Sequence, residues 1–288
     1  MKYAFITQHQ QRFSVIRMCH LLDVSTSAYY EWRKRPESPR RLEDQRLAES
    51  VKQSHVRSRM TYGARRIRKE LLETGETISR NRVTRLMRQQ GLESKVRRKF
   101  KATTNSNHDR PVAPNRLDRD FQADRPNQAY VGDITYIATH EGWLYLAVLI
   151  DLYSRAVVGW SMAERMTAQL ANDALTMAIW KRKPPKGLLI HSDRGSQYAS
   201  ALYQNTLQER GFICSMSRKG NCWDNAPAES FFHTLKTELT HHRHYPTREE
   251  AKQEIFEYIE VFYNRQRRHS TIGYQSPARF EQSVQHAA

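Results

Sequence analysis

The chain has 288 residues, of which 39% are hydrophobic, and its formal net charge is +17 at pH 7. That length and composition allow one large or two to three small domains with a buried core. A membrane-spanning protein is excluded, because no run approaches the roughly 18 apolar residues of a membrane helix, and no signal peptide is visible. We therefore expect a globular protein of the cytoplasm.

The positive charge lies almost entirely in the first part of the chain. Residues 1–110 contain 26 Lys and Arg against 11 Asp and Glu, whereas residues 111–288 contain 21 against 19. A basic segment with apolar periodicity is typical of a folded domain that binds a polyanion. Nucleic acid is the expected partner. An anionic membrane surface is the alternative, but no strongly amphipathic anchor helix is visible.

The cysteines show no spacing that indicates a metal site or a disulfide framework. Cys19, Cys214 and Cys222 lack a CxxC pattern and cannot form an even set of disulfides. We interpret them as reduced thiols and do not expect a structural zinc site.

Two short helices are predicted near the start of the chain, over residues 13–22 and 26–34, with Ser25 as the cap of the second. This pattern matches a helix-turn-helix, whose second helix enters the major groove of DNA. Tyr30 and Arg33 on the second helix are candidate DNA contacts. The same pattern also occurs in helical hairpins that bind nothing.

A second helical unit follows the polar stretch 36–43, with helices predicted over residues 47–56, 64–72 and 80–90. Apolar residues recur on one side of each helix and arginines on the other. An arginine face is often only a solvated surface, but here it indicates phosphate or groove contacts. The candidate DNA contacts are Arg65, Arg66, Arg80, Arg82, Arg85 and Arg88.

Residues 101–125 have no sustained period and contain prolines, which predicts a linker. Beyond it the pattern changes to an α/β domain. Strands are predicted over 130–137, 142–151, 156–161, 188–192 and 212–216, and helices over 167–180, 200–209 and 226–239. The order βββαβαβα is that of the ribonuclease-H-like fold. The predicted domains are 1–43 (first helix-turn-helix), 44–100 (second, DNA-binding), 101–125 (linker), 126–240 (ribonuclease-H-like core) and 241–288 (helical basic tail).

Three acids occupy places that this fold brings to one edge of the sheet. Asp133 lies in the first strand, Asp193 just beyond the fourth, and Glu229 in the first turn of the last helix. Close carboxylates repel one another, by up to about 4 kcal/mol per pair at an effective dielectric near 20. Divalent cations remove that cost. We therefore expect Mg²⁺ or Mn²⁺, as two ions about 4 Å apart, in a site for phosphodiester chemistry.

Lys236 lies two helical turns after Glu229, on the same face of the helix, and His233 lies one turn after it. Both are candidate DNA contacts, although a surface lysine would need no such role. Asn225 either positions the substrate or caps the helix. Asp151 ends the second strand near the site, but we assign it to a turn.

Two further segments have open interpretations. Residues 218–224 resemble a flexible loop that becomes ordered on DNA. The tail is predicted to be helical from 247 to about 263 and then interleaves basic and aromatic residues, including the candidate DNA contacts Arg265 and Arg268. It can fold back over the core, touch a phosphate, or do both.

These motifs resemble a known family, the integrase-core OrfB transposases of the IS-three group of bacterial insertion sequences. The resemblance runs from about residue 44 to residue 280. It is carried by VGDITY at 131–136, HSDRGSQY at 191–198, NAPAESFF at 225–232 with Lys236, and the tail from Tyr263-Asn264 to Pro277.

The resemblance implies that Asp133, Asp193 and Glu229 form a metal-binding triad and that the substrate is the terminal inverted repeats of a mobile element. Such enzymes expose a 3′-hydroxyl and use it to attack another DNA strand. The implied partners are transposon-end DNA and target DNA, with a homo-oligomer on DNA. In this group the active polypeptide is often a frameshifted fusion, so the resemblance also implies an upstream-frame protein or fusion as a partner. No leucine-zipper heptad is visible in this chain, so either it is the downstream product alone or this element dispenses with a heptad.

Two other functions stay open at this point. A catalytically silent DNA-binding regulator derived from a transposase would retain the basic helical units. A ribonuclease H or a junction-resolving nuclease would share the core but not those units.

Overall fold

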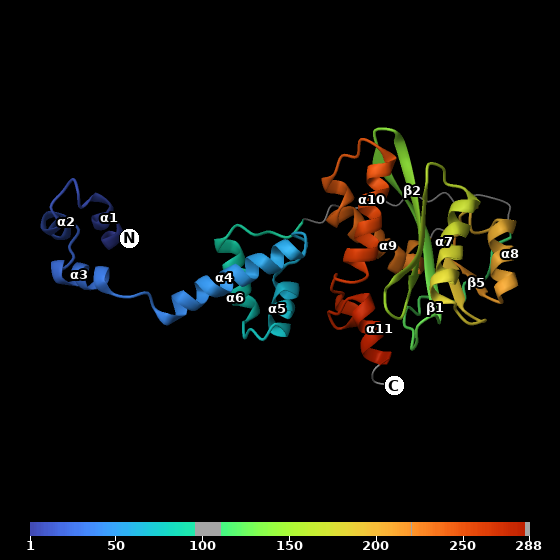
Figure 1. The fold of residues 1–288 in the computed structure, drawn as a ribbon, viewed down its shortest axis with the longest axis horizontal. Helices are drawn as coiled ribbons and strands as arrows, with labels where there is room; N and C mark the ends of the chain where they lie inside the picture. The colour runs from blue at the N-terminus through green and yellow to red at the C-terminus, as the bar shows by residue number, and fades with distance from the viewer. Residues whose placement is uncertain (96–110, 220, 286–288) are drawn as a thin grey trace.

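The computed structural model describes residues 1–95, 111–219 and 221–285 of the chain. Figure 1 shows an elongated arrangement, with a small helical unit at the N-terminal end, a second helical unit on the long helix α4, and a sheet domain. In the described residues, no helix is long and apolar enough to cross a membrane.

The first helical unit contains three helices rather than the predicted two. They are α1 (Lys2–His9), α2 (Val15–Leu21) and α3 (Thr26–Lys34). The Ser25 side chain accepts a hydrogen bond from the Ala28 N–H, which confirms the predicted cap. Helix α1 was not predicted because no side chain caps it and because Ile6 is its only fully buried residue.

The second helical unit consists of α4 (Pro39–Arg57), α5 (Ala64–Glu73) and α6 (Arg80–Gln89). The prediction that the first of these helices starts at residue 47 is wrong. The Ser38 side chain caps α4 and Pro39 occupies its first turn, and both features favour a helix start there. The early turns of α4 are exposed and lack an apolar period, which is why the sequence did not indicate them. The helix runs without a break through the domain boundary predicted between residues 43 and 44.

The sheet domain has the predicted element order. Its strands are β1 (Ala129–Thr139), β2 (Gly142–Asp151), β3 (Val157–Ala163), β4 (Leu189–Ser192) and β5 (Ile213–Met216). They lie in the order β3-β2-β1-β4-β5. The first three strands pair antiparallel, and β4 and β5 extend the sheet in parallel from β1. Helices α7 (Ala168–Arg182), α8 (Ala201–Arg210) and α9 (Ala226–Glu238) connect or follow the later strands.

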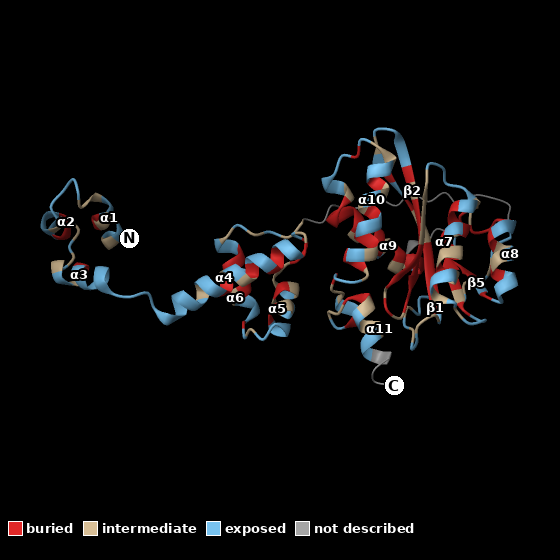
Figure 2. Cartoon of the chain, in the orientation of Figure 1, coloured by how far each residue is buried: buried red, intermediate tan, exposed pale blue. Residues whose placement is uncertain are grey.

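Two apolar cores lie on the two faces of this sheet (Figure 2). Helices α7 and α8 cover one face. Helix α9 covers the other together with α10 (Arg248–Glu257) and a π-helical turn (Tyr258–Tyr263). This confirms that the tail is helical to about residue 263 and folds back over the core. A final helix, α11 (Pro277–Gln285), was not predicted.

The C-terminal part of the predicted linker is anchored on the sheet domain. The backbone N–H groups of Arg116 and Leu117 donate to the Ser215 hydroxyl, at 2.9 and 3.2 Å. Residues 101–110 of the predicted linker lie outside the described part of the chain. Cys19 and Cys214 are free thiols, and the side chain of Cys222 is not described.

The second helical unit contacts the tail through polar bonds. The Tyr62 hydroxyl accepts from the backbone N–H of Arg268 at 2.8 Å and donates to the Gln266 carbonyl at 3.3 Å. The Arg268 and Arg279 guanidinium groups both donate to the Glu73 carboxylate. These bonds dock α5 against the end of the tail.

Gly159 is required where β3 meets α7. A Cβ at this position would lie 2.2 Å from the Ala174 carbonyl oxygen and 2.9 Å from the Ala178 nitrogen, both of which are backbone atoms. We expect Gly159→Ala to lower the free energy of unfolding of the sheet domain by about 1–3 kcal/mol, as measured by urea unfolding monitored by tryptophan fluorescence. Ser161→Ala on the same strand is the control, with an effect within about 0.5 kcal/mol. Equal stability of both variants would contradict this close approach.

The contact at Glu73 should weaken in acid. The hydrogen bond from Arg268 is the main cause that lowers the pKa of Glu73 from 4.5 to about 2. A lowered pKa means that the stabilisation is complete above pH 4.5 and is lost as the pH falls toward 2. The protection factors of the backbone amides of residues 266–276, which correct exchange for its intrinsic pH dependence, should therefore fall in that window. Glu73→Gln should exchange faster already at neutral pH and respond less to acid; a profile identical to that of the unmodified chain would refute the contact.

Candidate active site and nucleic-acid interface

Strand register places Asp133 and Asp193 level with each other. Val131 of β1 pairs with His191 of β4 in parallel, and each aspartate lies two residues further along. Because side chains alternate along a strand, this register directs both aspartates to the same side. Burial raises the pKa of Asp133 well above its usual value, and the negative charges of Asp193 and Glu229 raise it further. The negative charges of Asp193 and Glu229 therefore act on Asp133, as expected for acids that converge on one region.

Glu229 reaches the same region from the first turn of α9, as predicted. Burial raises its pKa as well. Helix α9 is held against the sheet by the apolar residues Phe231, Phe232 and Leu235, which are at most 4% exposed. The position of Glu229 thus depends on a helix whose other side lies in the core.

Asn225 connects α9 to the strand of Asp133. The expectation that it might cap the helix is wrong, because its side chain makes no capping bond. Instead its amide nitrogen donates to the Gly132 carbonyl at 3.2 Å. Its side-chain oxygen is buried with no hydrogen-bond partner among the described residues. The same holds for the buried Tyr198 hydroxyl, whose pKa is raised well above its usual value by burial and then by Asp133 and Asp193.

The segment 218–224 is anchored by a residue that the sequence analysis did not single out. Asp224 is fully buried and accepts hydrogen bonds from the backbone and guanidinium of Arg218, from Arg119 and from Asn115. The bonds from Arg218 hold the pKa of Asp224 well below its usual range. The linker thus fastens the loop that precedes α9. The sequence around Asp224 has no helical or strand periodicity, so it did not indicate this anchoring role.

Lys236 lies beside the acids, as the helical spacing predicted. Its ammonium nitrogen is 5.0 Å from the centre of the Tyr136 ring. Burial lowers the pKa of Lys236, and the charge of Asp133 opposes that shift. This partly desolvated cation is well suited to bind a phosphate.

The three acids do not form a finished metal site in this conformation. Within the residues that the structure describes, no group of three or more His, Cys, Asp or Glu side chains has metal-binding geometry. Asp133 and Asp193 each accept a backbone N–H bond of 2.8 Å, from Ile134 and Gly195 respectively. The donor set nevertheless fits a hard divalent cation, because it consists of carboxylates whose mutual repulsion a cation would relieve.

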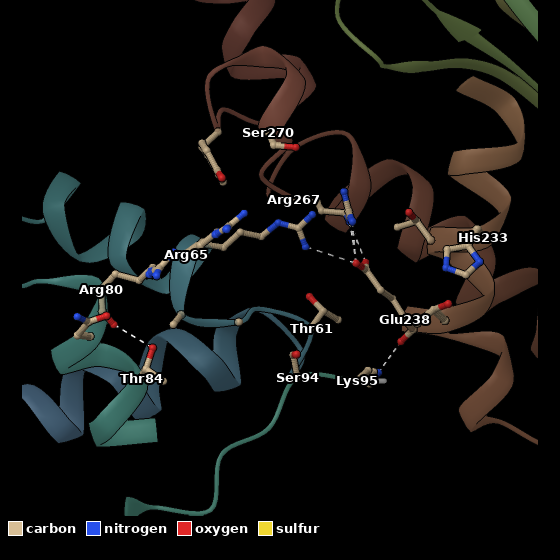
Figure 3. Close-up of a pocket in the computed structure, with 17 residues that line it drawn as sticks. Thr61, Arg65, Arg80, Thr84, Ser94, Lys95, His233, Glu238, Arg267 and Ser270 are labelled. Atoms are coloured by element: carbon tan, nitrogen blue, oxygen red, sulfur yellow. Dashed lines mark hydrogen bonds and ion pairs between the residues drawn. The ribbon is translucent and has the colours of Figure 1, made fainter. Parts of the chain in front are cut away.

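Several predicted DNA contacts line one groove of about 840 Å³ between the second helical unit and α9 (Figure 3). Figure 3 shows Arg65 and Arg80 on one side of this groove and His233 and Arg267 on the other. Arg66 also lines it, 3.8 Å from the carboxylate of Glu238. The structure therefore brings Arg65, Arg66, Arg80 and His233 together.

Two of the other predicted contacts bind acids inside the second helical unit. Arg82 and Arg85 each donate to Asp44 at 2.7 Å, and Arg82 also pairs with Glu43. Both acids lie on α4. The lack of acids within α6 itself therefore did not mean that its arginines are all available to DNA. Arg88 is exposed and lines a smaller groove beside α6.

The remaining predicted contacts are spread over the ends of the chain. Tyr30 is 43% exposed on α3, and Arg33 donates to Gln10 at 3.0 Å. Arg265 is exposed, whereas Arg268 is held by Glu73 in the contact between the second helical unit and the tail. These residues do not join the groove of Figure 3.

Asp151 belongs to the fold, as the sequence indicated. It is fully buried, accepts from the backbone N–H groups of Asn127 and Tyr153, and pairs with Arg182 at 3.3 Å. His191 is also structural. Burial lowers its pKa to about 4, and its ring bonds to hydroxyl groups of the β5 segment.

Comparisons with known families match most of the chain. A family described as HTH-like domain matches residues 42–100. Two families described as Integrase core domain match residues 123–222 and 229–284. The structure of simian T-cell lymphotropic virus intasome in complex with a PP2A regulatory subunit is similar at 20% identity and a TM-score of 0.48. That match covers 62% of this chain and 60% of the other.

Curated relatives are much more similar. The Insertion element IS600 uncharacterized 31 kDa protein of Shigella sonnei is 50% identical, over 94% of this chain and the whole of the relative. Transposase InsF for insertion sequence IS3A of Escherichia coli is 49% identical, over 98% of both chains. With an integrase core of the ribonuclease-H-like fold behind an HTH-like region, and with this identity over almost the full length, the chain belongs to the IS3 family of insertion-sequence transposases.

Proposed function

We propose that this protein binds the terminal inverted repeats of an insertion sequence and catalyses metal-dependent DNA cleavage and strand transfer. The observation that carries the proposal is the β1–β4 register that sets Asp133 and Asp193 level with each other, together with Glu229 in the first turn of α9, which packs on the same sheet. Residues 126–240 act as the catalytic core in this proposal, and residues 44–100 act as a DNA-binding domain.

Asp133, Asp193 and Glu229 would hold Mg²⁺ or Mn²⁺, as two ions. Carboxylate oxygens suit these cations, and the two buried unpartnered polar groups at Tyr198 and Asn225 show that the region can take further polar ligands or water. When bound, such ions activate a water or 3′-hydroxyl and stabilise the leaving oxygen of a phosphodiester.

The chain's own residues bind and orient the DNA. Lys236 binds a phosphate next to the reacting one, since it lies close enough to Asp133 to affect its pKa. The groove of Figure 3 takes phosphates of the DNA backbone, with Arg65, Arg66, Arg80 and His233 as contacts. Asn225 keeps α9 in register with β1 through its bond to Gly132.

The other candidate DNA contacts also belong to this proposal. Arg82 and Arg85 would have to share or leave Asp44 to reach a phosphate, and Arg268 would have to leave Glu73. Arg88, Arg265, Tyr30 and Arg33 have exposed or partly exposed positions. A homo-oligomer on DNA, and an upstream-frame protein or fusion, stay predictions of the family resemblance.

Replacing one carboxylate should separate catalysis from binding. Asp193→Asn removes a charged metal ligand with little change in shape, so we expect strand transfer of end DNA in Mg²⁺ to fall at least about a hundredfold, to background. Binding of the same DNA in Ca²⁺ or EDTA should change less than about threefold. Asp173→Asn, an exposed acid on α7, is the matched control and should retain activity.

Full strand transfer by Asp193→Asn would contradict the proposal. An unmodified chain that binds ends but neither cuts nor joins them, with any divalent metal, would instead indicate a DNA-binding regulator.

DNA binding should weaken steeply with salt, because cations in the groove displace counterions from phosphates. Each phosphate contact contributes about −0.9 to the slope of log K against log salt concentration on duplex DNA. Arg65→Ala and Arg80→Ala should each make that slope less steep by about 1. Arg210→Ala, an exposed arginine on α8, is the control and should leave it unchanged. A nearly flat slope for the unmodified chain would rule out the groove as a duplex-binding surface.

A further inference from the structure

A second hollow, of about 400 Å³, lies along the edge of β1 beyond Asp133; we call it the edge pocket. Strand β4 pairs with β1 only over Ala129–Val131, and an isolated bridge joins Thr139 to Tyr245 further along. The edge pocket lies near the far end of that interval. Its walls include Tyr136, Trp143, Lys236, His241, Arg243 and His244.

One wall of the edge pocket is aromatic and exposed. Tyr136 and Trp143 are 40% and 49% exposed, and their ring centres are 4.7 Å apart at 75°. Trp143 pairs across the hairpin with Ala138, which lies two residues from Tyr136 on the same face of β1. Both rings are therefore carried by a two-stranded hairpin, and about half of Trp143 is exposed to solvent.

The other walls are cationic or neutral. Lys236 and Arg243 supply positive charge, and no Asp or Glu occurs among the described residues that line the edge pocket. Arg243 also pairs with Glu254 at 3.1 Å, outside the lining. Although His241 and His244 are close by, the described residues contain no cluster of metal-binding geometry there. The chemistry suits a planar, anionic ligand rather than a cation.

Lys236 links the edge pocket to the candidate active site. It lies against the Tyr136 ring and is close enough to Asp133 to affect the charge there. Tyr136 lies three positions after Asp133 on β1, a rise of about 10 Å at about 3.3 Å per residue. That is the scale of one or two nucleotides of an extended strand. The side chains of Asp133 and Tyr136 leave opposite faces of the strand, and Lys236 reaches both residues.

We propose that the edge pocket is a subsite for one unstacked DNA base, from a nucleotide that flanks the reacting phosphate. The base stacks on the Tyr136–Trp143 wall, and Lys236 and Arg243 bind the neighbouring phosphates. This inference rests on the proposed function, since it needs a DNA strand at Asp133. Aromatic stacking beside cations is the usual way in which proteins hold unpaired bases, and it tolerates any base because each has a π-face.

A subsite of this kind has a mechanistic use. A duplex end must be opened for its phosphate to approach buried carboxylates, and unstacking a base costs a few kcal/mol. Stacking on a protein ring returns about 1–3 kcal/mol per base. Trp143 would thus act as a positioning residue that keeps the strand open, without touching the reacting atoms.

The test removes the Trp143 ring from the protein and single bases from the DNA, separately and together. Strand transfer is measured with Mg²⁺ for the unmodified chain and for Trp143→Ala, on intact DNA and on DNA with single abasic sites near the reacting phosphate. On intact DNA, Trp143→Ala should be slower by roughly five- to hundredfold. At one flanking position, the abasic site should abolish the difference in rate between Trp143→Ala and the unmodified chain, because it removes both the base that stacks on the ring and the cost of unstacking that base. Trp143→Phe should restore most of the rate, because it restores a ring.

Controls make each result decisive. Trp180→Ala, a tryptophan 74% exposed on α7, should match the unmodified chain on every substrate. Abasic sites placed in the end strand or in the target duplex show which of the two supplies the base. If Trp143→Ala is slower than the unmodified chain by the same factor at every flanking abasic position, in either DNA, as on intact DNA, the subsite is refuted. A chain that neither cleaves nor joins intact DNA refutes the proposed function itself, which keeps the two failures distinct.

Discussion

Everything at the candidate site depends on how α9 is held against the sheet. Phe231, Phe232 and Leu235 of this helix are buried against the strands and against tail residues such as Ile259 and Phe262. Fully burying each of these side chains is worth about 1.5–3 kcal/mol. The free energy that brings Glu229 to Asp133 therefore comes from the apolar side of α9. The tail is part of the site for the same reason, although its α10 and π-helical turn supply none of the three acids.

The end of α9 connects the same helix to the second helical unit. Glu238 is 8% exposed and accepts from Arg267 in the tail at 2.7–3.1 Å and from the Tyr258 hydroxyl at 2.8 Å. Burial alone would lower the pKa of Arg267, but the charge of Glu238 and its hydrogen bonds raise it, so the guanidinium stays charged. Such a buried pair adds little net stability but fixes orientation. Because Arg66 and Lys95 also reach Glu238, a shift of the second helical unit acts directly on the helix that carries Glu229.

The sequence predicted what depends on local periodicity. The strand order, the element that carries each of Asp133, Asp193 and Glu229, and the position of Lys236 on one face of α9 all follow from spacings of two or 3.6 residues. Features set by distant partners were not predictable in this way. Asp224 looked like a loop residue because Arg119 and Asn115, which anchor it, are more than a hundred residues earlier. Helix α11 was missed because its pattern is short.

The arginine face of α6 is a second case in which a residue on another helix changed what the sequence had indicated. On the sequence, its arginines formed a cationic stripe with no acid among them. In the structure Asp44 of α4 binds Arg82 and Arg85, so part of that stripe holds the helical unit together. Spacing along one helix reports the charge of that helix, not the charge of its neighbour. Arg65 and Arg80, which line the groove, are the stronger candidates for DNA because they face α9 across a hollow.

The acids and α9 together explain how a site of like charges can fold before any ion binds. A close carboxylate pair costs up to about 4 kcal/mol at an effective dielectric near 20. The apolar side chains of α9 outweigh that cost, and the backbone N–H groups of Ile134 and Gly195 each neutralise part of one carboxylate. What remains is repulsion, which raises the pKa of Asp133 and which a divalent cation would relieve. The fold thus fixes where the acids lie, and the backbone N–H bonds of Ile134 and Gly195 hold two of them there.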